Sequence, residues 1–118
     1  MNMAPPMSAK EIVLAFIEAM NNEDFITARA YVSEDMKFVG VMGTRDSADA
    51  YFKDMEKMKF KYDIKKVFED GSDVCLFYDI NMGEKTIFSC GWYKLIGGKI
   101  NSFQVIFDPR PLLKDDSK

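Results

Sequence analysis

The stretch Asp73–Asp108, DVCLFYDINMGEKTIFSCGWYKLIGGKINSFQVIFD, decides the fold of this chain. It holds three segments rich in β-branched and aromatic residues, which are typical of strands. Glycines separate the segments and supply the positive φ that tight turns require. The expected strands, which together predict an antiparallel meander, are Asp73–Met82, Ile87–Leu95 and Ile100–Phe107.

The first expected strand is apolar on both of its faces, because side chains alternate along a strand. One face consists of Val74, Leu76, Tyr78 and Ile80. The other face consists of Cys75, Phe77, Asp79 and Asn81, and it becomes polar only toward its end. Both faces therefore need cover. The helices of the chain can cover one of them, and we expect the other to be the subunit interface of a homodimer.

Length and composition indicate one packed domain over residues 1–118, because 47% of the 118 residues are hydrophobic. We expect loose tails at residues 1–7 and 112–118. The net charge of -3 disfavours nucleic acid as a partner. No apolar run approaches the roughly 18–20 residues of a membrane span, and the first residues do not resemble a signal peptide. The two cysteines are too few for a disulfide framework, so we expect reduced thiols and a cytoplasmic location.

The chain contains no histidine. This excludes Ser-His-Asp and Cys-His catalysis and any metal site that uses histidine ligands. No other ligand cluster is visible in the sequence, so we predict neither a metal nor a cofactor. Any acid–base chemistry must come from Asp, Glu, Tyr, Lys or Cys.

The N-terminal half predicts helices. Ser8 and Glu11 have the spacing of a capping box, and a helix with one apolar stripe follows to about Met20. A second helix is expected from Phe25 to near Ser33. The remaining expected elements are a strand at Met36–Val41, a helix capped by Thr44 or Asp46 and ending near Met58, a strand with a bulge at Phe60–Glu69, and a turn at Asp70-Gly71. Helices followed by a run of strands favour an α+β fold with helices on one face of an antiparallel sheet.

This order resembles the nuclear transport factor two-like superfamily, and within it the SnoaL-like (polyketide cyclase-like) proteins. Two stretches carry the resemblance. The first is Ala15–Phe25, which contains the acidic turn Asn21-Asn22-Glu23-Asp24, followed by Tyr31–Phe38. The second is Trp92–Ile100, with its Gly-Gly-Lys-Ile turn, followed by Phe107-Asp108. The resemblance implies a cone-shaped curved sheet wrapped around a long helix, an apolar pocket in the cone, and homodimers packed through the sheet. It also implies an isomerase, cyclase, epoxide hydrolase, dehydratase or non-catalytic binder, so the fold does not choose among these functions.

The sequence departs from the catalytic patterns of this superfamily. Gly40 stands where the steroid isomerases would need a base, Phe16 stands where they would need a tyrosine, and Cys90 or Gly91 stands where they would need an acid. Phe77 replaces the arginine that epoxide hydrolases place two residues before an aspartate. The pocket histidine of the polyketide cyclases is missing as well.

Asp79 is the candidate general base, because the resemblance implies that its face of the strand points into the cone. A carboxylate among apolar side chains has its charged form disfavoured, which suits acid–base chemistry. Tyr93 is the candidate hydrogen-bond donor, with Tyr31 and Tyr51 as alternatives. The competing interpretation is that Asp79 lies near the open rim as an ordinary carboxylate, either hydrated or bonded to a neighbouring tyrosine.

The expected pocket wall consists of Phe16, Met20, Phe38, Phe52, Met55, Cys75, Phe77, Phe103, Val105 and Phe107. The alternative is that these side chains only fill a core, as aromatic residues and methionine usually do. The first interpretation predicts a small-molecule pocket, with an acid–base enzyme acting on an apolar ligand. The second predicts a non-catalytic binding or dimeric interaction module.

Overall fold

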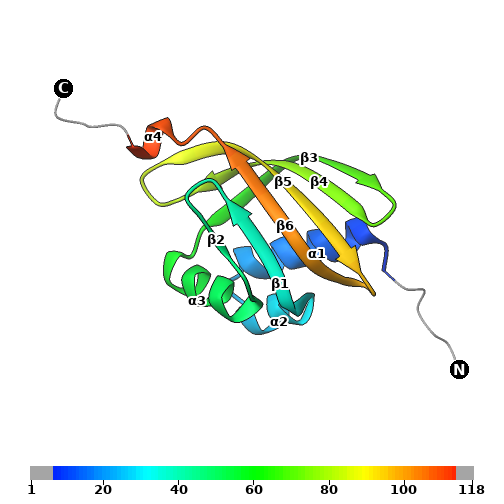
Figure 1. The fold of residues 1–118 in the computed structure, drawn as a ribbon. Coiled ribbons are helices and arrows are strands. Elements are labelled where there is room, and N and C mark those ends of the chain that lie inside the picture. The colour runs from blue at the N-terminus through cyan, green and yellow to red at the C-terminus, as the bar shows by residue number, and fades with distance from the viewer. Residues whose placement is uncertain (1–6, 114–118) are drawn as a thin grey trace, which may run out of the picture.

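The computed structural model describes residues 7–113, which form a six-stranded sheet with helices packed against it (Figure 1). The helices are α1 (Ala9–Asn21), α2 (Phe25–Ala30), α3 (Ala48–Met58) and α4 (Arg110–Leu113). The strands are β1 (Val32–Gly40), β2 (Gly43–Arg45), β3 (Lys61–Asp70), β4 (Asp73–Asn81), β5 (Thr86–Ile96) and β6 (Lys99–Phe107). The expected α+β class is confirmed.

The order of strands across the sheet is β2-β1-β6-β5-β4-β3. The expected antiparallel meander of β4, β5 and β6 is confirmed by its pairing. The expectation of a wholly antiparallel sheet is wrong, because β1 pairs with β6 in parallel. After the β1–β2 hairpin, α3 carries the chain to the opposite edge of the sheet. The meander then returns across the sheet, and its last strand lies beside β1 in the same direction.

Local sequence signals explain most element boundaries. The capping box of α1 is present: the Ser8 hydroxyl accepts from the Glu11 amide at 3.1 Å, and the Ser8 amide donates to the Glu11 carboxylate at 2.8 Å. The expected cap of α3 is wrong, since Ser47 caps it and Thr44 belongs to β2, opposite Val39. The expected bulge in β3 is confirmed, between Ile64 and Lys66.

The helices cover one face of the sheet, which we call the inner face (Figure 1). On β4 this is the face of Val74, Leu76, Tyr78 and Ile80, all of which are buried. Across the sheet it continues through Tyr93 of β5 and Phe103 of β6, which lie directly opposite each other. The Tyr78 and Tyr93 hydroxyls are 3.1 Å apart, and both lie against Gly91, where a Cβ atom would be 2.5 Å from the Tyr78 oxygen. This position therefore has no room for a side chain.

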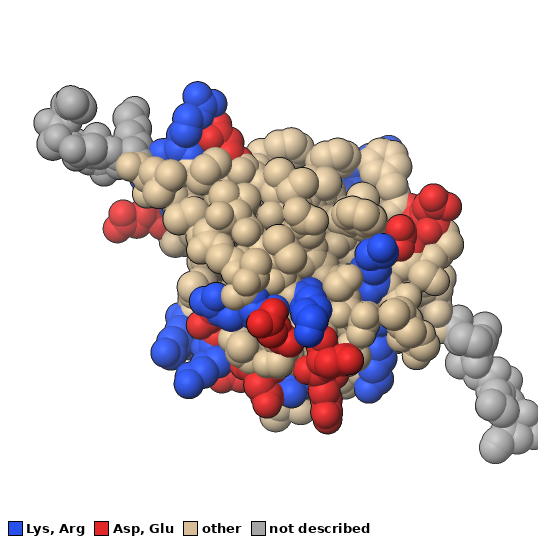
Figure 2. Space-filling model, viewed as in Figure 1, with Lys and Arg blue, Asp and Glu red and all other residues tan. Residues whose placement is uncertain are grey.

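The opposite face of the sheet, which we call the outer face, is uncovered within the described residues. Strand pairing places Cys75, Phe77, Phe88, Trp92 and Ile106 together on it. Phe88 is 60% exposed and Ile106 is 57% exposed. Figure 2 shows a broad surface without charged groups over this face, with Lys, Arg, Asp and Glu at its margins.

The expected tails lie mostly outside the described residues, because residues 1–6 and 114–118 are not part of the description. The expectation was wrong for Leu112 and Leu113, which belong to the helical turn α4. Leu112 also contributes to the pocket described next.

Candidate ligand-binding site

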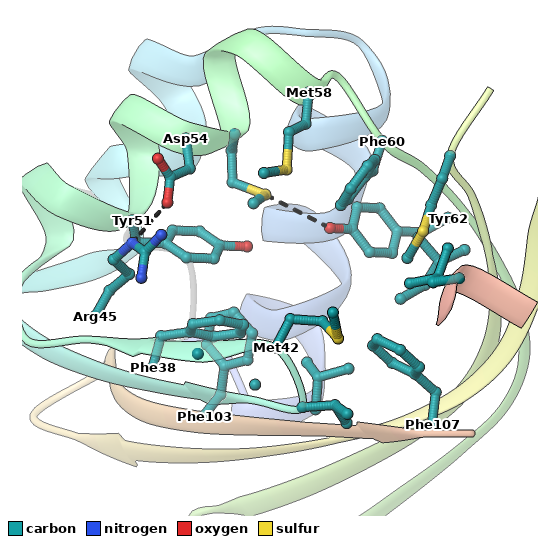
Figure 3. Close-up of a pocket in the computed structure, with 18 residues that line it drawn as sticks. Phe38, Met42, Arg45, Tyr51, Asp54, Met58, Phe60, Tyr62, Phe103 and Phe107 are labelled. Carbon is teal, nitrogen blue, oxygen red and sulfur yellow. Dashed lines mark hydrogen bonds and ion pairs between the residues drawn. The ribbon is translucent and has the colours of Figure 1, made fainter. Parts of the chain in front are cut away.

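A cavity of about 270 Å³ lies between α3 and the inner face of the sheet. The β1–β2 hairpin, the beginning of β3 and the ends of β4 and β6 complete its wall, and α4 contributes one side chain (Figure 3). Most of the lining is apolar: Phe38, Val41, Met42, Met55, Met58, Phe60, Ile80, Met82, Phe103, Val105, Phe107 and Leu112. Methionine side chains are flexible and polarizable, so this wall can adapt to differently shaped ligands.

Two charged residues line one end of the cavity. Arg45 of β2 donates from Nε to Oδ2 of Asp54, on α3, at 2.6 Å. A guanidinium nitrogen of Arg45 also donates to the Thr44 carbonyl at 2.7 Å, which holds the side chain against the strand. Oδ1 of Asp54 has no hydrogen-bond partner within residues 7–113. The pair therefore presents one free carboxylate oxygen and free guanidinium N–H groups.

Two tyrosine hydroxyls lie inside the cavity. Tyr51 of α3 and Tyr62 of β3 point toward each other, as Figure 3 shows. The Tyr62 hydroxyl donates to the Met55 sulfur at 4.0 Å, which is a weak bond. Within the described part of the chain, the Tyr51 hydroxyl makes no hydrogen bond of standard geometry and interacts only loosely with the Tyr62 hydroxyl, although Tyr51 is only 3% exposed.

Burial controls the protonation of both phenols. It raises the pKa of Tyr51 well above its ordinary value, and the nearby Tyr62 and Tyr78 raise that pKa further. Burial also raises the pKa of Tyr62 to about 12, against a smaller lowering by the Tyr51 hydroxyl. Both hydroxyls are therefore neutral at physiological pH and serve as hydrogen-bond donors.

The structure places Asp79 away from this cavity. Asp79 lies on the outer face, opposite Phe88 of β5 and Asp63 of β3, and its carboxylate is 3.6 Å from the Lys65 ammonium group. The prediction that the Cys75–Asp79 face points into the cone is therefore wrong. Because both faces of β4 are apolar near its start, alternation alone did not show which face the helices cover.

The expected pocket residues divide into three groups. Phe38, Met55, Phe103, Val105 and Phe107 line the cavity. Phe16, Met20 and Phe52 are buried in the core beside it without lining it. Cys75 and Phe77 lie on the outer face with Asp79, so their expected place in the pocket wall is wrong. Tyr93 points inward as expected, but it is buried among core rings and does not line the cavity.

Sequence reasoning missed the polar pair and one of the two phenols. Tyr51, Asp54, Met55 and Met58 recur at helical spacing, so they form one face of α3. That signal was available in the sequence, and it would have placed Asp54 beside Tyr51. Arg45 carried no such signal, because β2 was not expected.

The described residues contain no group of three or more His, Cys, Asp or Glu side chains placed to hold a metal ion. Among residues 7–113, no helix is long and apolar enough to cross a membrane. Both cysteines are free thiols.

Comparison with known proteins identifies relatives of the whole fold. An NTF2-like protein of unknown function from Cytophaga hutchinsonii is 49% identical, with a TM-score of 0.91 over 95% of this chain and all of that chain (100%). An LEH-like epoxide hydrolase from M. tuberculosis is 23% identical, with a TM-score of 0.77 over 90% of this chain and 86% of that one. An uncharacterized cystatin fold protein from Novosphingobium aromaticivorans is 19% identical, with a TM-score of 0.78 over 85% of this chain and 98% of that one.

At 23% and 19% identity, the second and third similarities show the fold alone. No curated protein is a significant match to this sequence. A family model described as the SnoaL-like domain matches residues 13–103, which include most of α1, all of α2 and α3, and the meander as far as Phe103. This chain therefore belongs to the SnoaL-like domain family.

Proposed function

We propose that this chain binds a compact, mostly apolar small molecule in the cavity between α3 and the inner face of the sheet. The observation that carries the proposal is the cavity itself, which has about 270 Å³ of free volume inside a wall of aromatic and methionine side chains. Pockets that bind small molecules are typically apolar, with a few placed polar groups. The cavity is slightly smaller than the range of about 300–1,000 Å³ usual for ligand pockets, which favours a compact ligand.

The binding proposal predicts that Val105→Phe weakens the saturable binding of cyclohexane, used as an apolar probe. Val105 is buried and lines the cavity, so a phenyl ring there takes up the space that the ligand would occupy. We expect binding to weaken by about tenfold or more, because a loss of about 1.4 kcal/mol of apolar contact is sufficient. The measurement is an NMR titration that follows the methyl groups of the methionines.

The matched control is Ile106→Phe, which makes a similar change at the next residue on the opposite face of β6. It should bind cyclohexane as the unmodified chain does. Equal binding by the Val105→Phe and unmodified chains would contradict the proposed site.

The Arg45–Asp54 pair favours acid–base turnover as a second candidate function. Among the described residues that line the cavity, Asp54 is the one carboxylate, and its Oδ1 is free while Arg45 holds Oδ2. Such an oxygen can take a proton from a bound ligand and return it at another atom. The epoxide hydrolase among the structural neighbours supports chemistry in this fold without identifying a reaction.

Turnover can be tested by deuterium exchange at the carbons beside the carbonyl of cyclohexanone in D₂O. We expect the unmodified chain to accelerate the exchange, and Asp54→Asn to slow it by about 10² or more, the usual contribution of a positioned base. Asp79→Asn is the control and should leave the rate unchanged, since Asp79 lies on the outer face. Acceleration that survives Asp54→Asn would remove Asp54 from this role.

We further propose that the outer face is covered by a second copy of the chain. The centre of this face is apolar and uncharged, so a twofold-related copy meets no charge repulsion there. Phe77 and Phe88 already stack on it, with ring centroids 5.9 Å apart and an interplanar angle of 10°. A contiguous apolar surface of this kind is unusual on a monomer. A cytoplasmic location, where both thiols stay reduced, is part of the same proposal.

A further inference from the structure

The Tyr51 hydroxyl is the polar group of the cavity that the fold itself does not use. Its side chain is 3% exposed, and within residues 7–113 its oxygen interacts only with the facing Tyr62 hydroxyl, at a geometry too loose for a standard hydrogen bond. The oxygen itself is open to the cavity, because no side-chain nitrogen or oxygen among the described residues is both fully buried and unpaired, a state that would cost about 1–3 kcal/mol. The hydroxyl points into the cavity, so a molecule bound there can supply the missing bond (Figure 3).

The Tyr62 hydroxyl faces Tyr51 across the same space and is only weakly engaged. Its bond to the Met55 sulfur is 4.0 Å long, and a thioether is a poor acceptor. Exchanging that sulfur for a ligand oxygen would therefore strengthen the bond. The backbone of Tyr62 is fixed, since its amide donates to the Asn21 side chain at 2.7 Å and its carbonyl accepts from the same side chain at 2.8 Å. The donor is thus held on a rigid strand.

We propose that Tyr51 and Tyr62 form a recognition site for one oxygen acceptor on an otherwise apolar ligand, such as the carbonyl oxygen of a small cyclic ketone. This inference rests on the proposed function and adds the chemical class of the ligand. A carbonyl oxygen has two lone pairs, so it can accept from both hydroxyls at once. The surrounding aromatic and methionine wall takes the hydrocarbon part of the ligand.

The protonation of the phenols sets the polarity of the recognised group. Both stay neutral at physiological pH because burial raises the pKa of each, so both offer an O–H bond. A carboxylate ligand would bring a second negative charge into a cavity where Arg45 already neutralises Asp54, and burying a charge is costly without a counter-charge of its own. A pure hydrocarbon would leave the Tyr51 hydroxyl unpaired. A neutral ketone or ether brings no charge into the cavity and also gives the Tyr51 hydroxyl an acceptor.

The test compares two ring compounds, cyclohexanone and cyclohexane, in the full chain and in Tyr51→Phe. Since one hydrogen bond contributes about 0.5–1.5 kcal/mol, we expect Tyr51→Phe to weaken cyclohexanone binding by roughly 2- to 13-fold and to leave cyclohexane binding unchanged. Adding Tyr62→Phe should weaken ketone binding further. In the unmodified chain, the ¹³C resonance of the bound carbonyl should move downfield relative to the Tyr51→Phe complex, because hydrogen bonding polarises the carbonyl.

Tyr31→Phe is the matched control, since Tyr31 does not line the cavity. It should change neither affinity nor the carbonyl resonance. If Tyr51→Phe alters the affinity for both ring compounds equally, or for neither, the recognition site is wrong while the binding function stands. If neither compound binds the unmodified chain, the proposed function and this inference both fail.

Discussion

Replacing Phe16 with alanine is expected to lower the free energy of unfolding by about 3–5 kcal/mol, the usual cost of emptying a phenylalanine site in a core. Phe16 is 1% exposed and lies where α1 meets the sheet. Its ring centroid is 6.3 Å from that of Phe52, 6.4 Å from that of Tyr93 and 6.2 Å from that of Phe103. These partners come from α3, β5 and β6, so the ring connects α1 to three elements that are distant from it in the sequence.

Denaturant unfolding of the two chains measures this difference. Ile26→Ala is the control, because Ile26 is 88% exposed on α2 and its truncation removes little buried contact. Its effect should stay within about 0.5 kcal/mol, as is usual at the surface. If Phe16→Ala were no more costly than Ile26→Ala, the assignment of Phe16 to the centre of the core would be wrong.

Introducing a charge at Phe88 is expected to separate the proposed homodimer into monomers. Phe88→Glu would bring two like charges into or near the apolar centre of a twofold interface, where they have no counter-charge. Each chain on its own should remain folded, because the Phe88 side chain is on the outer face and is already 60% exposed. We expect the dissociation constant of the dimer to rise by about a hundredfold or more, which corresponds to about 2.7 kcal/mol.

Analytical ultracentrifugation over a range of concentrations measures this change. Ile26→Glu adds the same charge at an exposed site on α2, away from the outer face, and should leave the dimer intact. Monomeric unmodified chain at all accessible concentrations would contradict the second copy as the cover of this face. A Phe88→Glu chain that stays dimeric would move the interface elsewhere.

The elements of the fold that depend on local signals could be predicted from the sequence. The capping box at Ser8 and Glu11, the bulge after Ile64 and the glycine turns of the meander all act within a few residues. The parallel pairing of β1 with β6 could not be predicted from strand order along the chain. It depends on the path of α3, which contacts β1 while leading to β3 at the far edge.

The site was harder to predict because the sequence of β4 does not show which of its two faces the helices cover. Val74 and Cys75 each begin an apolar face, and hydrophobicity alone does not choose between them. The choice is made by long-range pairing, which continues the Val74 face through Tyr93 and Phe103 to the aromatic core. The family resemblance was used to choose the face, and it wrongly placed Asp79 in the pocket, whereas the carboxylate that lines it, Asp54, lies on α3.

The central claim is that a small apolar molecule enters the cavity beneath α3. An NMR titration of ¹³C-methyl-labelled methionines with cyclohexane or cyclohexanone tests it most directly, because some methionines line the cavity and others lie in the core outside it. Met42, Met55, Met58 and Met82 line the cavity, whereas Met20 and Met36 are buried without lining it. We predict saturable shifts for the first group and little change for the second. No saturable shift at any cavity methionine with either compound, or equal shifts in both groups, would contradict the account.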